Sequence, residues 1–458
     1  MLEELKEFDL MLREATKSVE AELTLENVGW TLLGGASGDI ITSAQRITAV
    51  QQSRLYFLKD PLARQSIRLW TDYSFGTGMT WQTDNKTTSK ALDLFWKSPA
   101  NSAILGASGQ RKSSDRLLVD GEIFFAMFLG AGGEATIRRI DPLEITEIIT
   151  DTDDIERPLY YKRDWMNRQG KQQTTYYKST LNAKGEPGTD ASGGAVTAND
   201  EALVYHLAYN TITQRGNPLI LPALDWMKQY RRFLASRVAV MLALARFAWK
   251  VKVQGGPAAV TAAKGVYQDQ TPQAGAIAIE NMGADMQPIR TDSGASQAYQ
   301  DGRMIKLQVC AAVGIPEQYF GDISTGNLAT ARTVELPLMK QFESYQKVWA
   351  DTYTALDNIV LEHAGVSPDK WYVDRDFPPI APEDAVATAQ SLAAIVATMP
   401  ELASSRDVQQ AALMALGINS PGKVLDALTK EAKSNGNVAL IKALRQIREV
   451  VNAGNNGH

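Results

Sequence analysis

The apolar positions of this chain follow a helical period over long stretches, and these stretches are separated by short segments of strand-like alternation. The longest helical stripe lies between Arg332 and His363, where apolar side chains recur at spacings of three and four residues. Because this spacing places them on one face, we predict a single long helix here, bent near its start by Pro337. The stripe consists of Leu338, Phe342, Tyr345, Trp349, Tyr353, Leu356 and Val360.

Two more helical runs lie upstream, on either side of a short insert. The first, 217–248, opens on Asn217-Pro218, which is an N-cap residue followed by proline at the first helical position. It leads into Trp249–Val253, which alternates like a strand, and the second run covers 293–315. We therefore predict a helix pair that is interrupted by a small α/β insert, 249–292, with further strands at 274–279 and 286–290.

The N-terminal region, 1–216, combines helical periods with several short strands. Residues 2–22 have an acidic, amphipathic helical pattern, and 44–73 is mostly helical with a break at Asp60-Pro61. Asp120-Gly121 is a turn signal, and 182–198 has the Gly, Ser and Thr content of a loop. The predicted strands cover 79–81, 117–129, 135–140, 145–150, 159–163 and 203–208.

The C-terminal region begins with a predicted strand, 371–377, which ends at the Pro378-Pro379 boundary. Residues 380–452 are rich in Ala and Leu and predict helices, and 453–458 have the composition of a disordered tail. The fold class that we predict is α+β, mainly α.

Composition excludes several functional classes. The net charge of −5 argues against a protein that grips nucleic acid tightly, but not against one that lets it slide past. The single cysteine, Cys310, cannot form a disulfide within the chain, which favours a reducing cytosol and a small buried hydrophobe. The longest apolar run, Val238–Leu244, is too short to cross a bilayer, so we expect a soluble protein without a membrane partner.

The amino-acid sequence contains no complete motif for catalysis or metal binding. Gly106–Ser113 approaches a phosphate-binding loop but lacks the glycine before Lys112. The acidic stretch Asp151–Glu156 is interpreted as a solvated turn. The three histidines, His206, His363 and His458, are scattered and form no metal-binding spacing. We therefore predict no catalytic residue, no metal site, no cofactor and no enzyme activity.

A basic and aromatic segment, Tyr230-Arg-Arg-Phe233, lies on the first helix of the pair. One interpretation is a solvated basic face. The other is a face that contacts nucleic acid or a partner subunit.

Several short motifs follow one another in an order that resembles the portal proteins of tailed bacteriophages, the head-to-tail connectors of the DNA-packaging vertex. The most specific is Gly314-Ile-Pro-Glu-Gln-Tyr-Phe-Gly321, which is similar to a family signature ahead of a channel loop. The others are Leu55-Tyr-Phe-Leu-Lys-Asp-Pro61, Tyr73-Ser-Phe-Gly-Thr-Gly78, Val119-Asp-Gly-Glu122, Arg139-Ile-Asp-Pro142 and Arg215-Gly-Asn-Pro218.

The resemblance implies a ring, usually of twelve subunits, around a channel at one capsid vertex. Double-stranded DNA would be packaged and ejected through it without sequence specificity. The implied partners are the terminase large subunit (an ATPase), the major capsid protein and scaffold, and the head-completion or adaptor proteins. The implied location is the virion, and the host cytoplasm during assembly. The implied parts are a wing (1–216), paired stem helices (217–248 and 293–315), a clip (249–292), a tunnel loop (316–331), a long kinked helix with a returning strand (332–379) and a crown (380–452).

The resemblance also implies roles for individual residues. Twelve copies with a net charge of −5 would carry −60, so most of the ring would repel phosphates. The DNA-facing loop residues would be Ser324, Thr325, Gly326, Asn327, Thr330 and Arg332. Arg231, Arg303 and Lys306 would face the channel from the stem or, equally, form ion pairs between subunits. Lys250, Lys252, Gln254, Lys264 and Tyr267 would contact partners at the clip.

Two other functional classes stay open. One is an oligomeric capsid-associated scaffold protein without a DNA channel. The other is an enzyme, which hydrolytic turnover abolished by a single point mutation would support.

Overall fold

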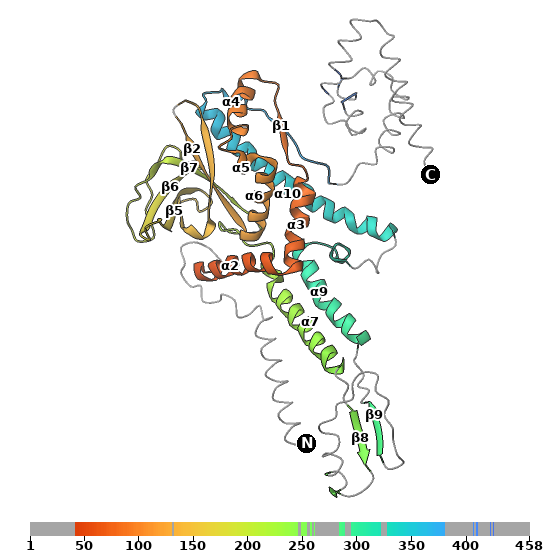
Figure 1. Cartoon of the computed structure of the whole chain (residues 1–458). Helices are drawn as coiled ribbons and strands as arrows, with labels where there is room; N and C mark the ends of the chain where they lie inside the picture. Colours follow the sequence, from red (N-terminus) through yellow and green to blue (C-terminus); the bar gives the residue numbers. More distant parts are fainter. Residues whose placement is uncertain are drawn as a thin grey trace, which may run out of the picture. The chain divides into compact units, whose positions relative to one another are not determined.

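The computed structural model divides into two compact units, 1–378 and 379–458, and the chain is traced in Figure 1. The predicted helix at 2–22, the predicted strand at 274–279 and almost all of the predicted helical region after 380 lie outside the described residues. The structure describes residues 42–130, 132–245, 249–253, 257–258, 261, 284–288, 295–321, 328–380, 406, 409–410, 422 and 425.

The first two helices are α2 (Ser43–Lys59) and α3 (Pro61–Phe75). The Asp60 carboxylate accepts hydrogen bonds from the backbone N–H groups of Leu62 and Ala63, each at 3.0 Å, and a proline occupies the first position of α3. This is an N-cap followed by a residue that cannot continue the preceding helix, so the predicted break is confirmed.

Three helices follow, α4 (Lys86–Trp96), α5 (Ser102–Leu105) and α6 (Ala107–Asp120). The prediction of a strand from residue 117 is therefore wrong over its first five residues, because 117–120 form the buried last turn of α6 and Gly121 is its C-cap. Gly121 ends this helix with φ at 84°, and its N–H donates to the Leu117 carbonyl at 2.8 Å. Asp120-Gly121 is thus a helix C-cap, because glycine adopts the left-handed conformation without steric cost.

A six-stranded sheet follows, in the order β3-β2-β7-β6-β5-β4. All neighbouring strands are antiparallel except β6 and β7, which are parallel. The predicted strands are confirmed, but β6 was not predicted, because its Gln, Thr and Tyr residues show no apolar alternation. The strands are β2 (Glu122–Leu129), β3 (Ala135–Ile140), β4 (Ile145–Thr150), β5 (Pro158–Met166), β6 (Gln172–Ser179) and β7 (Asn199–Ala208).

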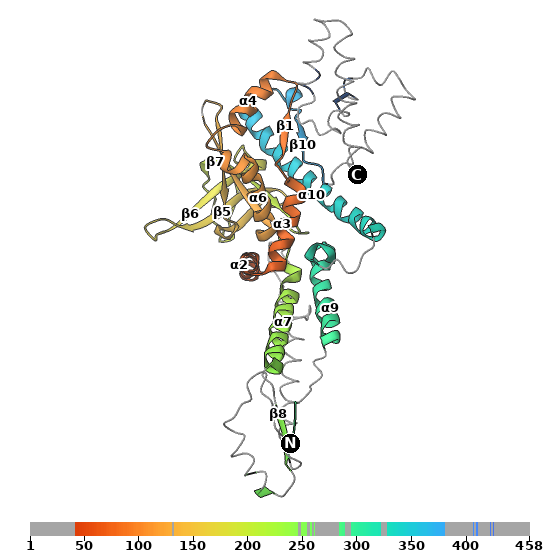
Figure 2. The ribbon, with the colours of Figure 1, turned by 45° about the vertical axis from the view of Figure 1, so that its right-hand side comes forward.

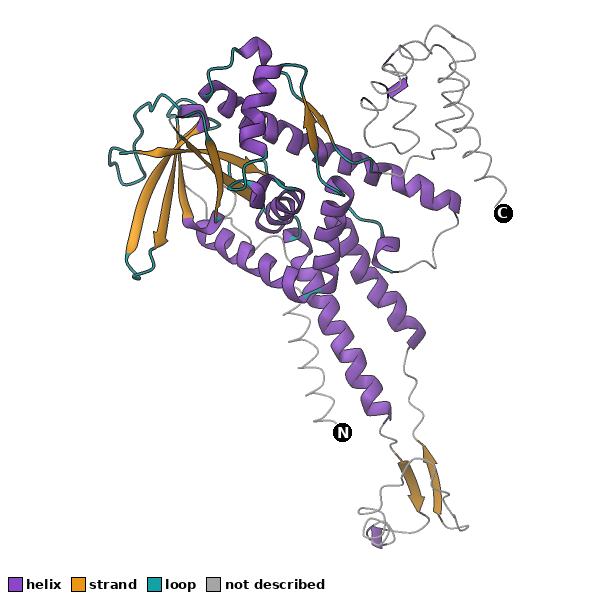
Figure 3. Cartoon of the chain, turned by 45° about the horizontal axis from the view of Figure 1, so that its top comes forward, coloured by secondary structure: helices purple, strands orange, loops and turns teal. Residues whose placement is uncertain are grey.

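Both faces of β2 are buried, because helices pack on one face and a side-chain cluster covers the other. Figure 3 shows the strands gathered beside the helices. Asn101, before α5, donates from its side chain to the carbonyls of Phe95 and Ala135, each at 2.9 Å, and accepts from the Ile137 N–H at 3.1 Å. This buried amide joins α4 to β3. The cluster on the other face comprises Phe124, Ala126, Ile140, Ile145, Tyr161, Tyr177, Ala202 and Val204.

The long predicted helix is α10 (Leu328–His363), and it contains Pro337. All seven residues of its predicted apolar stripe are buried, which confirms the stripe. The helix packs against α3 and α4, and the Trp70 ring lies edge-on to Phe342 and Tyr345 at centroid distances of 5.3 and 5.5 Å. The bend at Pro337 stays a prediction.

Two short strands, β1 (Thr80–Gln82) and β10 (Asp374–Asp376), pair antiparallel and confirm the predicted strands at these places. The short 3₁₀ helices are η2 (Pro142–Glu144), η3 (Thr180–Asn182), η4 (Leu221–Ala223), η5 (Glu317–Phe320) and η6 (Pro368–Lys370).

The predicted helix pair consists of α7 (Leu224–Ala245) and α9 (Ala295–Val313). Between them in sequence, β8 (Trp249–Val253) and β9 (Ala284–Pro288) form an antiparallel ladder. The prediction that the first helix starts at Asn217 is wrong by several residues. The Asn217 N–H donates to the Tyr209 carbonyl and the Leu219 N–H to the Leu118 carbonyl, so this stretch is bonded to the body instead.

Candidate functional site

The helix pair α7 and α9 runs side by side in both views of the ribbon (Figures 1 and 2). Gly302 of α9 is buried against Phe233 of α7, and a Cβ added at Gly302 would lie 2.7 Å from the ring carbon Cε1. Because that distance is shorter than any normal carbon contact, the missing side chain is what allows the two helices to approach here.

The apolar side chains of α7 are buried at the start of the helix and exposed further along it. Leu224 and Met227, at the start of the helix, are buried. Leu234, Val238 and Met241 follow at spacings of four and three residues, so they share one face, and all three are exposed, Met241 by 63%. The sequence pattern alone could not show this division.

The second helix of the pair also exposes apolar side chains. Tyr299, Met304 and Leu307 of α9 are exposed, Met304 by 67%. Met304 and Leu307 are three residues apart and therefore share one face of α9. The helix pair therefore presents apolar surface from both of its helices.

The basic residues of the helix pair are engaged within the chain. Arg231 lies with its guanidinium 4.7 Å from the centre of the Tyr56 ring, donates to the Tyr56 hydroxyl at 3.1 Å, and lies 3.6 Å from the Asp60 carboxylate. Arg303 donates from Nε to both carboxylate oxygens of Glu317, at 3.0 and 3.1 Å. These contacts hold α7 to α2 and α9 to η5, and the role of both arginines in a channel stays a prediction.

Two further residues of α9 that the sequence analysis singled out are Lys306 and Cys310. Lys306 is half-buried and close enough to influence the thiol electrostatically. Burial raises the pKa of Cys310 to about 11, against which Lys306 acts weakly. The thiol is therefore protonated at neutral pH, and the interpretation of Cys310 as a small buried hydrophobe is confirmed.

The loop and insert residues predicted from the resemblance are only partly described. Thr330 and Arg332 lie in the first turns of α10, and Lys250 and Lys252 lie in β8, paired with Gln287 and Asp285 of β9. Their assigned contacts with DNA and partners stay predictions. Ser324, Thr325, Gly326, Asn327, Gln254, Lys264 and Tyr267 lie outside the described residues.

A buried ion cluster lies where the body meets the segment that leads to α7. Glu122, fully buried at the start of β2, accepts from Arg215 Nη2 at 2.5 Å and from Arg46 Nη1 at 3.3 Å. Burial alone would raise the pKa of Glu122, but the charges and hydrogen bonds of Arg215 and His206 together outweigh this effect, so the pKa falls to about 2. The cluster ties α2, β2 and the chain before α7 together.

At the same junction, the backbone at Gly121 passes directly against the backbone at Gly216 and Asn217, which we call the glycine crossing. A Cβ at Gly121 would lie 2.2 Å from the Asn217 carbonyl carbon, and one at Gly216 would lie 1.9 Å from the Gly121 oxygen. Only glycine fits at either position, because the two backbones touch.

The two histidines that the structure describes make structural contacts. His206 stacks on Phe124 with ring centres 4.2 Å apart and contacts Glu122 at 3.1 Å, while His363 Nε2 contacts the Gly130 carbonyl at 2.7 Å. Within the part of the chain that the structure describes, no group of three or more His, Cys, Asp or Glu side chains could hold a metal ion. Over the same residues, no helix combines the length and hydrophobicity needed to cross a bilayer.

One site was missed by the sequence analysis, a basic cavity of about 670 Å³ lined by α2, α3 and α6. Arg111, Lys112 and Arg116 line it, and the first two had been considered only as part of an incomplete phosphate-binding loop. The available signal was the spacing of Lys112 and Arg116, which are four residues apart on what proves to be a helix.

Comparison with known proteins gives structural similarities only. No protein-family model and no curated protein matches this chain. Among solved structures, it is similar to a chain of the virion of the native gene transfer agent (GTA) particle, at 15% identity and a TM-score of 0.46, over 78% of this chain and 95% of that one. It is also similar to a chain in the neck of the native GTA particle computed with C12 symmetry (14% identity, TM-score 0.47, 81% and 93% covered).

A third similarity is to a chain in the neck of the empty GTA particle computed with C6 symmetry, at 14% identity and a TM-score of 0.44, over 82% of this chain and 92% of that one. These likenesses cover most of each chain. At this level of identity they concern the general course of the fold, and they assign no role to any residue of this chain.

Proposed function

We propose that this chain is the subunit of a portal ring at one vertex of a virion, through which double-stranded DNA is packaged and ejected. One observation carries the proposal. The helix pair α7 and α9 leaves apolar surface exposed on both helices, whereas the body buries its apolar stripe on α10 within the chain. The order of elements, with the β8–β9 insert between the paired helices and a long proline-containing helix after them, agrees with the resemblance seen in the sequence.

The two exposed surfaces favour a ring over a symmetric dimer. Leu234, Val238 and Met241 belong to α7, while Met304 and Leu307 belong to α9. When α7 of one copy packs on α9 of the next, the contact joins two different surfaces, and such head-to-tail contacts close into rings. The likeness to chains of the GTA neck points in the same direction without carrying the argument.

Electrostatics support a channel that conducts DNA without holding it. The chain is acidic, and Arg231 and Arg303 are neutralised by Asp60 and Glu317 in the same subunit. A ring built from such helices would offer few unpaired cations to phosphates, so DNA could slide. The uncharged loop residues before α10, with Arg332, would make the contacts with the duplex backbone.

The protein would act without catalysing a reaction of its own. Terminase would supply the energy of packaging. It would dock on the insert between α7 and α9, and the head-completion proteins would later bind at the same place. The capsid protein and scaffold would contact the body. A capsid-associated scaffold protein without a DNA channel is the competing function.

Electron microscopy of the purified full chain tests the ring, with the variant Met241→Glu and the matched control Met166→Glu. Both methionines are highly exposed, Met241 by 63% on α7 and Met166 by 73% on β5, so the same chemical change is made inside and outside the proposed interface. We expect end-on views of rings with a DNA-sized hole for the wild type and Met166→Glu, and monomers for Met241→Glu. Rings that survive Met241→Glu would contradict the proposed interface.

Shortening the loop before α10 tests the channel. Removing part of 324–330 in an infectious phage should lower the titre and change the length of packaged DNA. Rings with normal titre and genome length would favour the scaffold alternative.

A further inference from the structure

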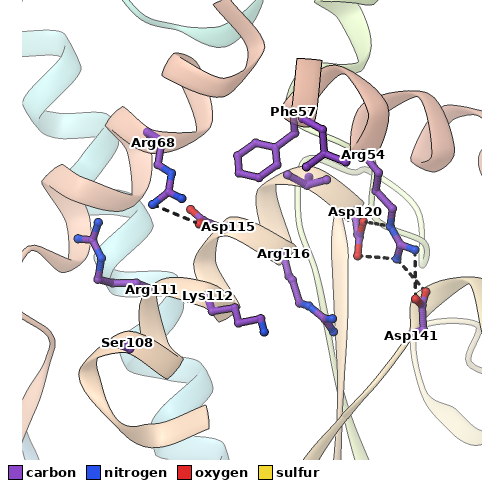
Figure 4. Close-up of a pocket in the computed structure, with 12 residues that line it drawn as sticks. Arg54, Phe57, Arg68, Ser108, Arg111, Lys112, Asp115, Arg116, Asp120 and Asp141 are labelled. Carbon is purple, nitrogen blue, oxygen red and sulfur yellow. Dashed lines mark hydrogen bonds and ion pairs between the residues drawn. The ribbon is translucent and has the colours of Figure 1, made fainter. Parts of the chain in front are cut away.

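The basic cavity between α2, α3 and α6 is lined by Lys112 and Arg116, which form no direct ion pair with the residues that the structure describes (Figure 4). Arg54 is held by Asp120 and Asp141, at 2.7 and 2.8 Å, and the other paired cations are Arg68 with Asp115 and Arg111 with Asp72. Across the residues that the structure describes, Lys112 and Arg116 have no ion pair.

The geometry of these two cations suits a helix. Lys112 is exposed, Arg116 is half-buried, and the two lie four residues apart on one face of α6. Figure 4 shows both side chains extending from the helix with no partner among the residues drawn. Two carboxylates four residues apart on an opposing helix would match their spacing.

An apolar surface borders the cations. Phe57, Leu58 and Val119 line the cavity, and Leu58 is 72% exposed. Leu55, one turn earlier on α2, is exposed as well. A partner that fits this site must therefore combine carboxylates with a row of apolar side chains.

We propose that the site is occupied by the N-terminal segment of the same chain, residues 2–22, as an amphipathic acidic helix. Its apolar stripe would cover Leu55 and Leu58. Glu3, Glu7 and Glu14 follow at spacings of four and seven residues and so share one flank of a helix. Glu7 and Glu14 are also neighbours of Met11, four and three residues away, which places the carboxylates beside the stripe.

The connection to the body is long enough for this docking. Residues 23–41 separate the segment from Thr42, which caps α2, and when extended they span roughly 60 Å. The site lies near Leu58, only about 23 Å along α2 from Ser43. The tether therefore reaches the cavity and raises the local concentration of the segment to the millimolar range.

The lining favours a peptide over nucleic acid. Asp115, Asp120 and Asp141 lie in the same cavity as the cations, and the apolar residues offer nothing to phosphate. An amphipathic peptide can cover the apolar lining and can also set Lys6 and Arg13 near these carboxylates, whereas a phosphate backbone offers neither an apolar surface nor a positive charge. The inference is independent of whether the chain forms a ring.

Hydrogen exchange on the full chain tests the docking. We expect the amides of 2–22 to exchange at least about tenfold more slowly than in the free peptide 1–22. The double variant Lys112→Glu/Arg116→Glu should lose this protection. The matched control Lys86→Glu/Lys90→Glu changes two exposed lysines with the same spacing on α4 and should keep it.

Reversing the charges on the N-terminal segment instead of the cavity tests the same contact without changing the folded body. Glu3→Lys/Glu7→Lys/Glu14→Lys leaves the body untouched and should lose the same protection. Exchange as fast as in the free peptide for the wild type, or protection unchanged in either charge-reversed variant, would overturn the proposal. Unchanged protection together with weaker binding of a DNA duplex by Lys112→Glu/Arg116→Glu would instead assign the site to nucleic acid.

A cysteine pair identifies the source of the segment. Leu5→Cys with Leu58→Cys should form a disulfide within one chain on oxidation, while Cys310 stays inert because it is buried. A covalent dimer would show that a neighbouring copy supplies the segment, and it would contradict docking in the same subunit.

Discussion

The long helix α10 in the body of the molecule (α2 to α6, the six-stranded sheet and α10) and the helix pair α7 and α9 differ in whether their apolar stripes are covered by the chain. In the body, the seven apolar residues of the α10 stripe are buried and the Glu122 carboxylate is matched by Arg215 and Arg46. In the helix pair, Arg231 and Arg303 are paired within the chain, but Leu234, Val238, Met241, Met304 and Leu307 are exposed. Under the proposed function, the body would be stable as one chain, whereas the helix pair would cover its apolar surface only in the assembled ring.

The two regions should therefore respond differently to substitution. Changes in the body should alter the stability of the single chain and leave assembly intact once it folds. Changes in the helix pair should alter assembly more than stability.

The largest expected effect is at the glycine crossing of the body. Gly121→Ala must place a methyl group 2.2 Å from a backbone carbon at a φ of 84°, so we expect a loss of about 4 kcal/mol or more in the free energy of unfolding. Gly133→Ala is the matched control, because its φ is 80° but nothing lies within 4 Å, and it should lose only about 1 kcal/mol. Denaturant unfolding measures both, and equal losses would show that conformation rather than crowding decides.

The next effect is at the buried ion cluster. Glu122→Gln leaves the Arg215 guanidinium buried without its carboxylate partner, and we expect a loss of about 3 kcal/mol in unfolding free energy. Glu343→Gln removes an exposed ion pair with Lys340 and should cost less than about 0.5 kcal/mol. A loss below about 1 kcal/mol for Glu122→Gln would mean that the cluster contributes little to the body.

A smaller effect follows from pH. The folded-state pKa of Glu122 is lowered from 4.5 to about 2, so its stabilisation is complete above pH 4.5 and is lost as the pH falls toward 2. Between pH 4.5 and pH 3 the wild type should lose about 2 kcal/mol more than Glu122→Gln does. Urea unfolding at both pH values measures the difference, and parallel losses in the two proteins would refute the assignment.

The smallest effect belongs to the contact between α7 and α9. Gly302→Ala should cost about 1 kcal/mol because the new Cβ meets the Phe233 ring at 2.7 Å. In a Phe233→Leu background the same change should be neutral, since the obstructing ring is gone and alanine favours helix. The double-mutant cycle should thus give a coupling of about 1 kcal/mol, and additive effects would show that the ring moves aside freely.

Much of the fold could be predicted because many elements carry their own signal. The apolar stripe on α10 is periodic over its whole length, and the N-cap residue Asp60 with the following proline predicts the start of α3. The strand β6 carries no such signal, because its place is set by pairing with β5 and β7. The last turn of α6 was mistaken for strand, because Leu117-Leu-Val119 is apolar in either structure and only Gly121 shows where the helix ends.

The candidate sites were predictable to a smaller degree. The helix pair and its insert followed from periodicity, but the burial of Phe233 against Gly302 and the exposure of Met241 did not. A helical period shows that residues share a face, and it cannot show whether the chain itself covers that face. The basic cavity was missed because its cations come from three helices, each of which is unremarkable alone.

By itself, the sequence determined the helix pair with its insert, the α+β class and the long apolar stripe of α10, because these depend on interactions between residues close along the chain. Only the tertiary structure decided which charges are neutralised, where two glycines must cross and which apolar faces stay uncovered. The physical reason is that pairing, crowding and burial depend on distances between atoms far apart in sequence, such as Arg231 with Asp60 and Gly121 with Asn217.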